Sequence, residues 1–190
     1  MSLGFLKSFL RNPSTLGAIW PSSPFLAEEM VRASELHTAS SVVELGPGSG
    51  AFTGHILANL PDGAHFAAIE KCPILANEVS GKFPEARIIQ GCATRLSDHL
   101  SNENIPRPNA ILSGLPWAIF DANLQNSILS EVHGTLAEGG VFSTFAYYGP
   151  HRLASGQRFR RTLERTFSHV QRSGVVIKNF PPAFVYSCKR

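Results

Sequence analysis

The sequence predicts an α/β protein built on one doubly wound, mostly parallel sheet of seven strands. Three observations predict it. The chain has 190 residues, 43% hydrophobic and 16% charged, which suits one folded domain and excludes wholesale disorder. From about residue 38 onward, short apolar runs alternate with helical segments. A glycine-rich loop directly follows the first of these runs, where such sheets bind ligands.

The strands are predicted from short apolar or β-branched runs bounded by turn residues. Helices separate most of the first five runs, which favours parallel pairing covered on both faces. No helix separates the last two runs, so we expect them to form an antiparallel hairpin at one edge of the sheet. The predicted strands are Ser41–Leu45, His65–Glu70, Arg87–Gln90, Ala110–Ser113, Val141–Tyr147, Val170–Ile177 and Phe184–Cys188.

The helices are predicted from amphipathic spacing and from their end signals. Pro73 stands at a first helical turn, where proline is favoured, and Gly139 follows the end of the longest helix. We expect N-terminal amphipathic and cover helices over residues 1–37, and the sheet domain over residues 38–190. The predicted helices after residue 12 are Pro24–Leu36, Phe52–Leu60, Pro73–Lys82, Asn123–Leu136 and Gln157–Thr166.

Charge and cysteine content narrow the class of protein. The formal net charge of +3 permits an anionic partner without demanding one. No apolar run reaches the roughly 18–20 residues that span a bilayer, and no secretory signal is evident. Cys72, Cys92 and Cys188 are far apart in the sequence, which indicates reduced thiols and no structural metal. We therefore expect a cytoplasmic protein.

The loop after the first predicted strand indicates a ligand site. Gly46, Gly48 and Gly50 alternate there, and glycine lets bare backbone approach a ligand closely. Glu70 ends the next strand about 20 residues further on, where an acid can accept hydrogen bonds from two ribose hydroxyls. A plain tight turn is the alternative interpretation of the glycines.

Two nucleoside cofactors compete for this loop. Gly46, Gly48 and Ala51 fit the dinucleotide pattern G-x-G-x-x-A, which places a pyrophosphate on the following helix N-terminus. S-adenosylmethionine has no phosphate, and its cationic methionine end suits an acidic approach. Glu44, just before the loop, supplies that acid. The pattern favours S-adenosylmethionine, with a nicotinamide dinucleotide as the alternative.

With Glu44–Gly50 and Glu70 as its first motif and ribose-binding acid, the chain resembles class I methyltransferases, which have a Rossmann-like fold. More narrowly, from about Phe5 to Tyr186, it resembles bacterial phospholipid N-methyltransferases and the related ribosomal RNA adenine dimethylases. The N-terminal Gly-Ala-Ile-Trp-Pro-Ser-Ser and the Ser-Gly-Leu-Pro element point to the phospholipid group. The segments that carry the resemblance are Gly17–Ser23, Val43–Gly50, Ser113–Pro116 and Asn179–Tyr186.

The resemblance implies a set of cofactor-binding residues at successive strand ends. Such enzymes usually carry Gly-Asp after the third strand, where the carboxylate holds the adenine amino group. Here the pair is Gly91-Cys92, and a thiol makes only weak hydrogen bonds, so adenine would rely on the Ala93 amide and apolar packing. The implied residues are Glu44, Gly46, Gly48, Gly50, Glu70, Lys71, Cys92, Ala93, Ser113 and Leu115.

The motif after the fourth strand bears on the methyl acceptor. The adenine dimethylases carry Asn-Leu-Pro-aromatic there, and the asparagine amide polarises the target amino group. This chain has Gly114 in place of that asparagine. An aromatic amine is a poor nucleophile that needs such help, whereas a deprotonated alkyl amine does not. The resemblance therefore implies N-methylation of phosphatidylethanolamine or its methylated derivatives. RNA adenine dimethylation and non-catalytic S-adenosylmethionine binding are the alternatives.

The candidate acceptor site is rich in aromatic residues. An aromatic cage suits an amine that becomes more cationic with each methylation, although single aromatics more often belong to a core. Tyr148 is the candidate for orienting or deprotonating the amine, with Tyr147 and Trp117 as the other catalytic candidates. His151 and Arg152 are candidates for holding a phosphodiester, or else lie in a solvated loop. The substrate-binding candidates are Trp20, Pro116, Phe120, His151 and Arg152.

Two segments indicate a membrane partner. In the first, apolar residues including Phe5 and Phe9 share one helical arc, with Lys7 and Arg11 on the other side, as in interfacial helices. Packing as a lid on the domain is the alternative. The second segment is a predicted helix with a basic cluster, which indicates either a solvated helix face or an anionic partner. The cluster consists of Arg158, Arg160, Arg161 and Arg165. We expect a phospholipid head group and an anionic membrane surface as partners, RNA as the alternative, and peripheral attachment at the inner face of the membrane.

Overall fold

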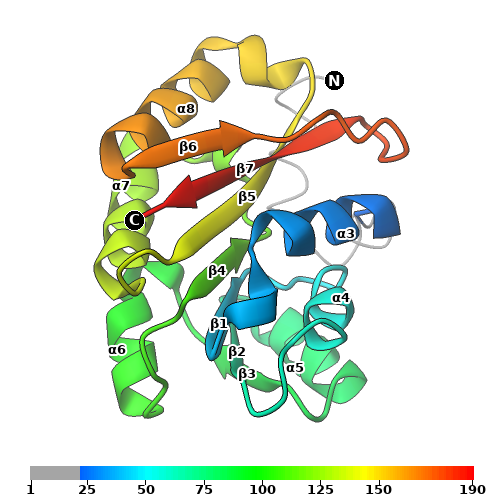
Figure 1. Ribbon diagram of the computed structural model, residues 1–190, viewed down its shortest axis with the longest axis vertical. Helices are drawn as coiled ribbons and strands as arrows, with labels where there is room; N and C mark the ends of the chain where they lie inside the picture. The colour runs from blue at the N-terminus through cyan, green and yellow to red at the C-terminus, as the bar shows by residue number, and fades with distance from the viewer. Residues whose placement is uncertain (1–21) are drawn as a thin grey trace.

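The computed structural model describes residues 22–190, which form one seven-stranded sheet with helices on both faces (Figure 1). The strand order is β3-β2-β1-β4-β5-β7-β6. The first five strands pair in parallel, and β7 pairs antiparallel with both β5 and β6. The predicted mostly parallel seven-stranded α/β fold is confirmed. The strands are β1 Ser41–Leu45, β2 His65–Glu70, β3 Arg87–Gln90, β4 Ala110–Ser113, β5 Val141–Tyr147, β6 His169–Arg172 and β7 Ala183–Lys189.

Six α-helices of the described part cover the two faces of the sheet. One face carries α3, α4 and α5, and the other carries α6, α7 and α8 (Figure 1). The chain crosses from one face to the other between β3 and β4, so the strand order changes direction between the central strands β1 and β4. A doubly wound sheet binds its ligand at such a point. The helices are α3 Pro24–Ala33, α4 Thr53–Leu57, α5 Pro73–Lys82, α6 Leu96–Asn102, α7 Ala122–Thr135 and α8 Ala154–Thr166.

A hydrophobic core lies on each face of the sheet. On one face Phe142 and Phe184 pack with residues of α7 and α8, and both rings are 0% exposed. On the other face Leu26 and Met30 of α3 pack against Val42 of β1. Ser23 caps α3 by accepting a hydrogen bond from the Leu26 amide at 3.3 Å. The helix α3 is therefore an integral part of the domain core.

The structure departs from the sequence prediction in two elements, α6 and β6. The helix α6 was not predicted, because only Leu96 and Leu100 are buried in its seven residues. The strand β6 ends at Arg172, and Val176 makes one isolated bridge to Ala183 instead of continuing the strand. The predicted terminal hairpin is confirmed, with β7 inserted between β5 and β6.

The first five predicted strands and the helix Pro73–Lys82 have the predicted bounds, and the remaining predicted ranges differ by a few residues at their ends. The helix α3 ends at Ala33 and a 3-10 turn, η1 Leu36–Thr38, follows it. Within residues 22–190, no helix is long and apolar enough to cross a bilayer. The predicted N-terminal amphipathic helix lies outside the described residues.

Candidate active site

The loops that follow the parallel strands meet at the carboxyl edge of the sheet. Backbone hydrogen bonds join their first residues to the neighbouring strands. The amide of Gly46 donates to Ile69, that of Gly91 to Glu70, and that of Gly114 to Leu45, each at 2.9 Å. The structure therefore brings the predicted cofactor-binding loops after β1, β2, β3 and β4 to one place.

The three predicted glycines all adopt positive φ, at 70°, 57° and 83° for Gly46, Gly48 and Gly50. A Cβ on Gly46 would lie 2.7 Å from the Leu115 side chain, and one on Gly50 would lie 2.5 Å from the Phe83 ring. A Cβ on Gly48 would meet no atom of residues 22–190 within 4 Å. Packing therefore fixes Gly46 and Gly50, whereas Gly48 presents bare backbone to open space that a ligand can fill.

The Glu70 carboxylate connects the loops after β1 and β2. It is 7% exposed, and its oxygens accept hydrogen bonds from the Gly48 amide at 3.1 Å and the Cys72 amide at 2.9 Å. Each carboxylate oxygen has a second lone pair. The group can therefore hold both loops and still accept hydrogen bonds from ribose hydroxyls.

A second carboxyl group, that of Glu44, is buried directly beneath the glycine loop. The Thr53 hydroxyl donates to its Oε2 at 2.7 Å, while its Oε1 is buried with no hydrogen-bond partner among residues 22–190. Burial raises the pKa of Glu44 to about 8; the Thr53 hydrogen bond opposes this shift and the Glu70 charge adds to it. The neutral form of Glu44 is therefore favoured in the ligand-free protein at neutral pH, and a cation placed at Oε1 would favour its carboxylate form.

These features fit S-adenosylmethionine. The open space at Gly48 admits a close ligand, the Glu70 oxygens suit two sugar hydroxyls, and the unpartnered Glu44 oxygen suits a cation. Sequence reasoning missed Thr53, because only the start of α4 brings its hydroxyl back to the strand residue nine positions earlier.

The loop after β3 contains Cys92, at the position where similar enzymes usually have an aspartate. This half-buried thiol accepts a hydrogen bond from the Thr94 hydroxyl at 3.1 Å. Burial alone would raise the pKa of Cys92, but the Thr94 hydroxyl and amide and the nearby Lys71 ammonium outweigh it and lower the pKa below its ordinary value. The buried Ala93 begins a 3-10 turn, η2 Ala93–Arg95. The loop thus has a polar, polarisable sulfur where an aspartate is usual.

The same loop holds a histidine that sequence reasoning treated as an ordinary surface or core residue. A Cβ on Gly91 would lie 2.2 Å from Nε2 of His99, so the imidazole of α6 occupies the space beside this glycine. A side chain at position 91 would therefore force the His99 imidazole to move. Only the unpredicted helix α6 makes this contact, so no sequence pattern signalled it.

The loop after β4 packs tightly against the glycine loop. A Cβ on Gly114 would lie 2.7 Å from the backbone oxygen of Gly46, too close without a backbone shift. The Ser113 hydroxyl accepts hydrogen bonds from the Trp117 indole at 3.1 Å and the Leu115 amide at 3.3 Å. Ser113 therefore holds the shape of this loop, and Pro116 stands at its turn into η3 Trp117–Ile119.

The Trp117 ring lies in the core. It is 2% exposed and stacks on Phe159 with ring centroids 4.9 Å apart. Phe120 packs edge-on against it at 5.9 Å and is partly buried. The structure thus places Trp117 beneath the loop, where it presents no open ring face to an acceptor. Trp20, the other predicted tryptophan of the cage, lies outside the described residues.

The residues after β5 form an exposed cluster. The Tyr148 side chain is exposed, and the Arg152 guanidinium donates to its hydroxyl at 3.3 Å. Nδ1 of His151 accepts a hydrogen bond from the Gly149 amide at 3.1 Å. Burial, together with Arg172, lowers the pKa of His151, so this imidazole is neutral at neutral pH and Arg152 carries the positive charge.

The half-buried Tyr147 lies beside this cluster, with its ring edge-on to Phe145 at 5.4 Å. Burial raises the pKa of Tyr147, so its hydroxyl keeps its proton at neutral pH. Of the two tyrosines, only Tyr148 has a hydroxyl that is exposed and linked to a cation.

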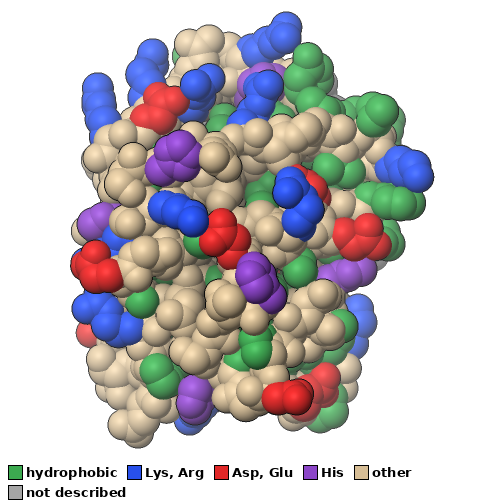
Figure 2. All heavy atoms as spheres, in the orientation of Figure 1, with side chains coloured by type: hydrophobic (Ala, Val, Ile, Leu, Met, Phe, Trp, Pro, Cys, Tyr) green, Lys and Arg blue, Asp and Glu red, His purple; other side chains and the backbone are tan. Residues whose placement is uncertain are grey.

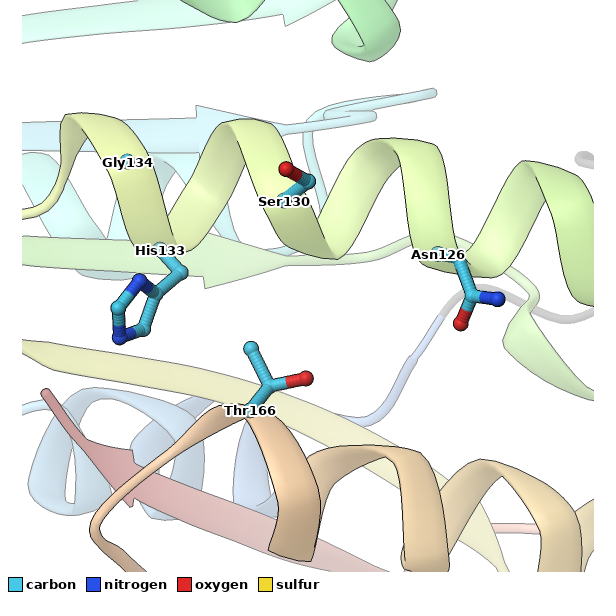
Figure 3. A pocket seen from close by; sticks show the side chains of 5 residues that line it. All are labelled: Asn126, Ser130, His133, Gly134 and Thr166. Carbon is cyan, nitrogen blue, oxygen red and sulfur yellow. The ribbon is translucent and has the colours of Figure 1, made fainter.

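An open groove of about 450 Å³ lies elsewhere, between α7 and α8. Figure 3 shows its lining from both helices. None of the predicted site residues contributes to it, so the carboxyl edge of the sheet remains the candidate site. The lining residues are Asn126, Ser130, His133, Gly134 and Thr166.

No family model matches the chain. An ornithine lipid N-methyltransferase of Singulisphaera acidiphila is 28% identical over 190 residues, which covers 97% of this chain and 94% of that protein. A ribosomal RNA small subunit methyltransferase A of Thermobifida fusca is 30% identical over 136 residues, covering 66% of this chain. The match spans only 45% of the Thermobifida protein.

Solved structures share the fold at low sequence identity. An O-methyltransferase from Bacillus cereus in complex with SAH has a TM-score of 0.71 at 13% identity, covering 100% of this chain and 92% of that one. An N-methyltransferase from Bradyrhizobium japonicum has a TM-score of 0.69 at 14% identity, covering 88% and 97%. The fold and the relatives together identify the chain as a class I S-adenosylmethionine-dependent methyltransferase, with S-adenosylmethionine as its cofactor.

Proposed function

We propose that this enzyme methylates the alkyl amine of a membrane lipid head group, with phosphatidylethanolamine or its methylated derivatives as acceptor. The observation that carries the proposal is the close contact at Gly114. A side chain there would begin 2.7 Å from the Gly46 backbone oxygen, so an asparagine amide has no room without a shift of the glycine loop. The acceptor must therefore be an amine that needs no amide to activate it, and a deprotonated alkyl amine meets that requirement.

The relatives support the same class of acceptor. The ornithine lipid N-methyltransferase matches this chain along almost the whole length of both proteins. The ribosomal RNA methyltransferase of Thermobifida fusca has more than half of its length outside the match. Ornithine lipids and phosphatidylethanolamine share a primary alkyl amine in the head group, so both belong in the test.

The residues of the site divide the work between cofactor and acceptor. Bound S-adenosylmethionine supplies an electrophilic methyl group on its sulfonium. Gly48 and Glu70 hold the sugar end, and Glu44 pairs with the methionine ammonium once ionised. On the acceptor side, the Tyr148 hydroxyl accepts a hydrogen bond from the amine and orients its lone pair, while Arg152 holds that hydroxyl. The catalytic contribution is chiefly positioning and exclusion of water.

Methyl transfer to fractionated acceptors tests the proposal. Radiolabelled S-adenosylmethionine is supplied with detergent-dispersed phosphatidylethanolamine, its monomethyl form, an ornithine lipid, or ribosomal RNA. We expect label in the lipid extract. Label in the RNA alone would contradict the proposal and favour the dimethylase alternative. Cofactor binding by calorimetry with no label in any acceptor would favour the non-catalytic alternative.

Replacement of Gly48 by alanine tests the cofactor cradle, with Gly63→Ala as the matched control. Both glycines have positive φ, and neither has an atom within 4 Å of an added Cβ. Both variants should lose about 1–2 kcal/mol of stability from backbone strain. Only Gly48→Ala should weaken S-adenosylmethionine binding, by about tenfold or more by calorimetry, since its methyl group fills ligand space. Equal affinities in the two variants would refute the assignment of the cradle.

The pH dependence of stability tests Glu44. Its folded pKa of about 8 lies above its ordinary value of 4.5, so protonation favours the folded state. That stabilisation is complete at low pH and is lost as the pH rises from about 4.5 towards 8. We expect Glu44→Gln, which stays neutral, to gain melting temperature relative to wild type as the pH rises from 5 to 8, by about 2–4 °C per kcal/mol. Parallel calorimetric profiles of the two proteins would show that Glu44 is ionised in the folded state.

Replacement of Gly114 by alanine tests the close contact behind the acceptor argument, with Gly134→Ala as control. The added methyl group at 114 meets the Gly46 oxygen. Gly134 lies in α7, and a methyl group there meets no atom of residues 22–190 outside the backbone of its own helix within 4 Å. We expect Gly114→Ala to lower both cofactor affinity and turnover. Gly134→Ala should keep both and gain about 0.5–1 kcal/mol of stability from helix propensity. Normal cofactor affinity in Gly114→Ala would show that the loops tolerate the side chain.

A further inference from the structure

Basic residues are concentrated in the last quarter of the chain. Residues 145–190 contain nine Lys or Arg and one Asp or Glu. Residues 22–144 contain six Lys or Arg and thirteen Asp or Glu. Figure 2 shows basic side chains gathered at the top of the molecule, over α8. The small net charge therefore conceals a strongly cationic region, which attracts anionic surfaces.

One face of α8 carries three of these nine basic residues. Arg158, Arg161 and Arg165 are exposed and follow each other at helical spacing. Within residues 22–190 the structure shows no ion pair for these three, while Arg160 on the neighbouring face bonds to Glu164 at 2.8 Å. Like charges on one helix face are destabilising. Only Arg165, in the last turn of α8, is well placed for the helix dipole, so the fold gains little from this basic stripe, Arg158, Arg161 and Arg165.

Exposed apolar side chains lie at the start of α8 and in the connection between β6 and β7. Leu153 occupies the N-cap of α8, is 53% exposed, and makes no side-chain cap. Leucine is among the poorest N-caps, so this residue serves neither helix nor core. Ile177 and Phe180 are 80% and 64% exposed in the connection between β6 and β7. We name Leu153, Ile177 and Phe180 the apolar rim.

Both features lie beside the candidate acceptor site. Leu153 follows Arg152, whose guanidinium bonds to the Tyr148 hydroxyl. The Tyr148 amide donates to the Pro182 oxygen at 2.8 Å, which ties the β6–β7 connection to the end of β5. A surface seated on the rim would therefore lie against the entrance through which a lipid amine must reach the carboxyl edge of the sheet.

We propose that the basic stripe and the apolar rim form the surface by which the enzyme docks on an anionic lipid bilayer. This proposal rests on the proposed lipid acceptor. Binding at a membrane interface is strengthened when arginines pair with anionic head groups and aliphatic side chains insert among acyl chains. RNA could pair with the arginines and stack a base on Phe180, but base recognition makes no use of the exposed aliphatic side chains of Leu153 and Ile177.

Charge neutralisation tests the basic stripe. The variant Arg158→Gln/Arg161→Gln/Arg165→Gln is compared with Arg32→Gln/Arg87→Gln/Arg95→Gln, which removes the same net charge from exposed sites elsewhere. Binding is measured by sedimentation with phosphatidylcholine vesicles with and without phosphatidylglycerol. We expect at least about tenfold weaker binding to anionic vesicles for the stripe variant and little change for the control. Equal losses in both variants would overturn the proposal.

A second pair of substitutions tests the apolar rim. In Leu153→Ser/Ile177→Ser, the new serine at 153 can cap α8, so the melting temperature should be unchanged or higher. Vesicle binding should nevertheless fall several-fold. Unchanged binding would remove the rim from the surface. If Phe9→Asp abolished binding while the stripe variant bound normally, the N-terminal segment alone would dock and the proposal would be wrong.

Turnover separates failure of docking from failure of the proposed function. With detergent-dispersed lipid the stripe and rim variants should match wild type, and with vesicles they should be slower. A wild type that methylates no lipid in detergent contradicts the proposed function, while sedimentation still tests docking. Stripe-dependent binding to RNA, with no binding to anionic vesicles, would overturn the proposal in favour of a nucleic-acid surface.

Discussion

The Glu70 carboxylate is the constraint on which the site depends. It holds the Gly48 amide with one oxygen and the Cys72 amide with the other, so two loops from adjacent strands share one buried anion. Charge-assisted hydrogen bonds of this kind are about twice as strong as neutral ones. The arrangement fixes the open side of the glycine loop before any ligand arrives, so little ordering remains to be done on binding.

The cofactor and acceptor sides of the site are mechanically coupled. The Leu115 side chain fills the space beside Gly46, and the Gly46 oxygen fills the space beside Gly114. Neither loop can change its side chains at these points without moving the other. A side chain at position 114, where we propose that the type of acceptor is determined, would therefore also disturb the cofactor loop.

Much of the fold and part of the site could be predicted from the sequence. The strands were predictable because buried parallel strands such as Ser41–Leu45 are short continuous apolar runs, and the glycines because three of them follow such a run. Features that depend on tertiary placement were not predictable. The burial of Trp117 follows from its stacking on Phe159, 42 residues away in α8, and the protonation of Glu44 follows from complete burial beneath a loop. The helix α6 escaped because two buried leucines make too weak a pattern.

Three residues of the described part conflict with the local rules of folding. Glu44 has a buried oxygen without a partner, Leu153 is a poor helix cap, and Ile177 is an exposed aliphatic side chain. Each costs the folded state something, and elsewhere the same chain caps α3 with Ser23 and α7 with Asp121. Sequences that obey such rules generally tend to break them where function requires it. A cation at Glu44 would pair its buried oxygen, and a bilayer at Leu153 and Ile177 would cover their side chains. The enzyme with cofactor bound and docked on a membrane would therefore have none of the three conflicts.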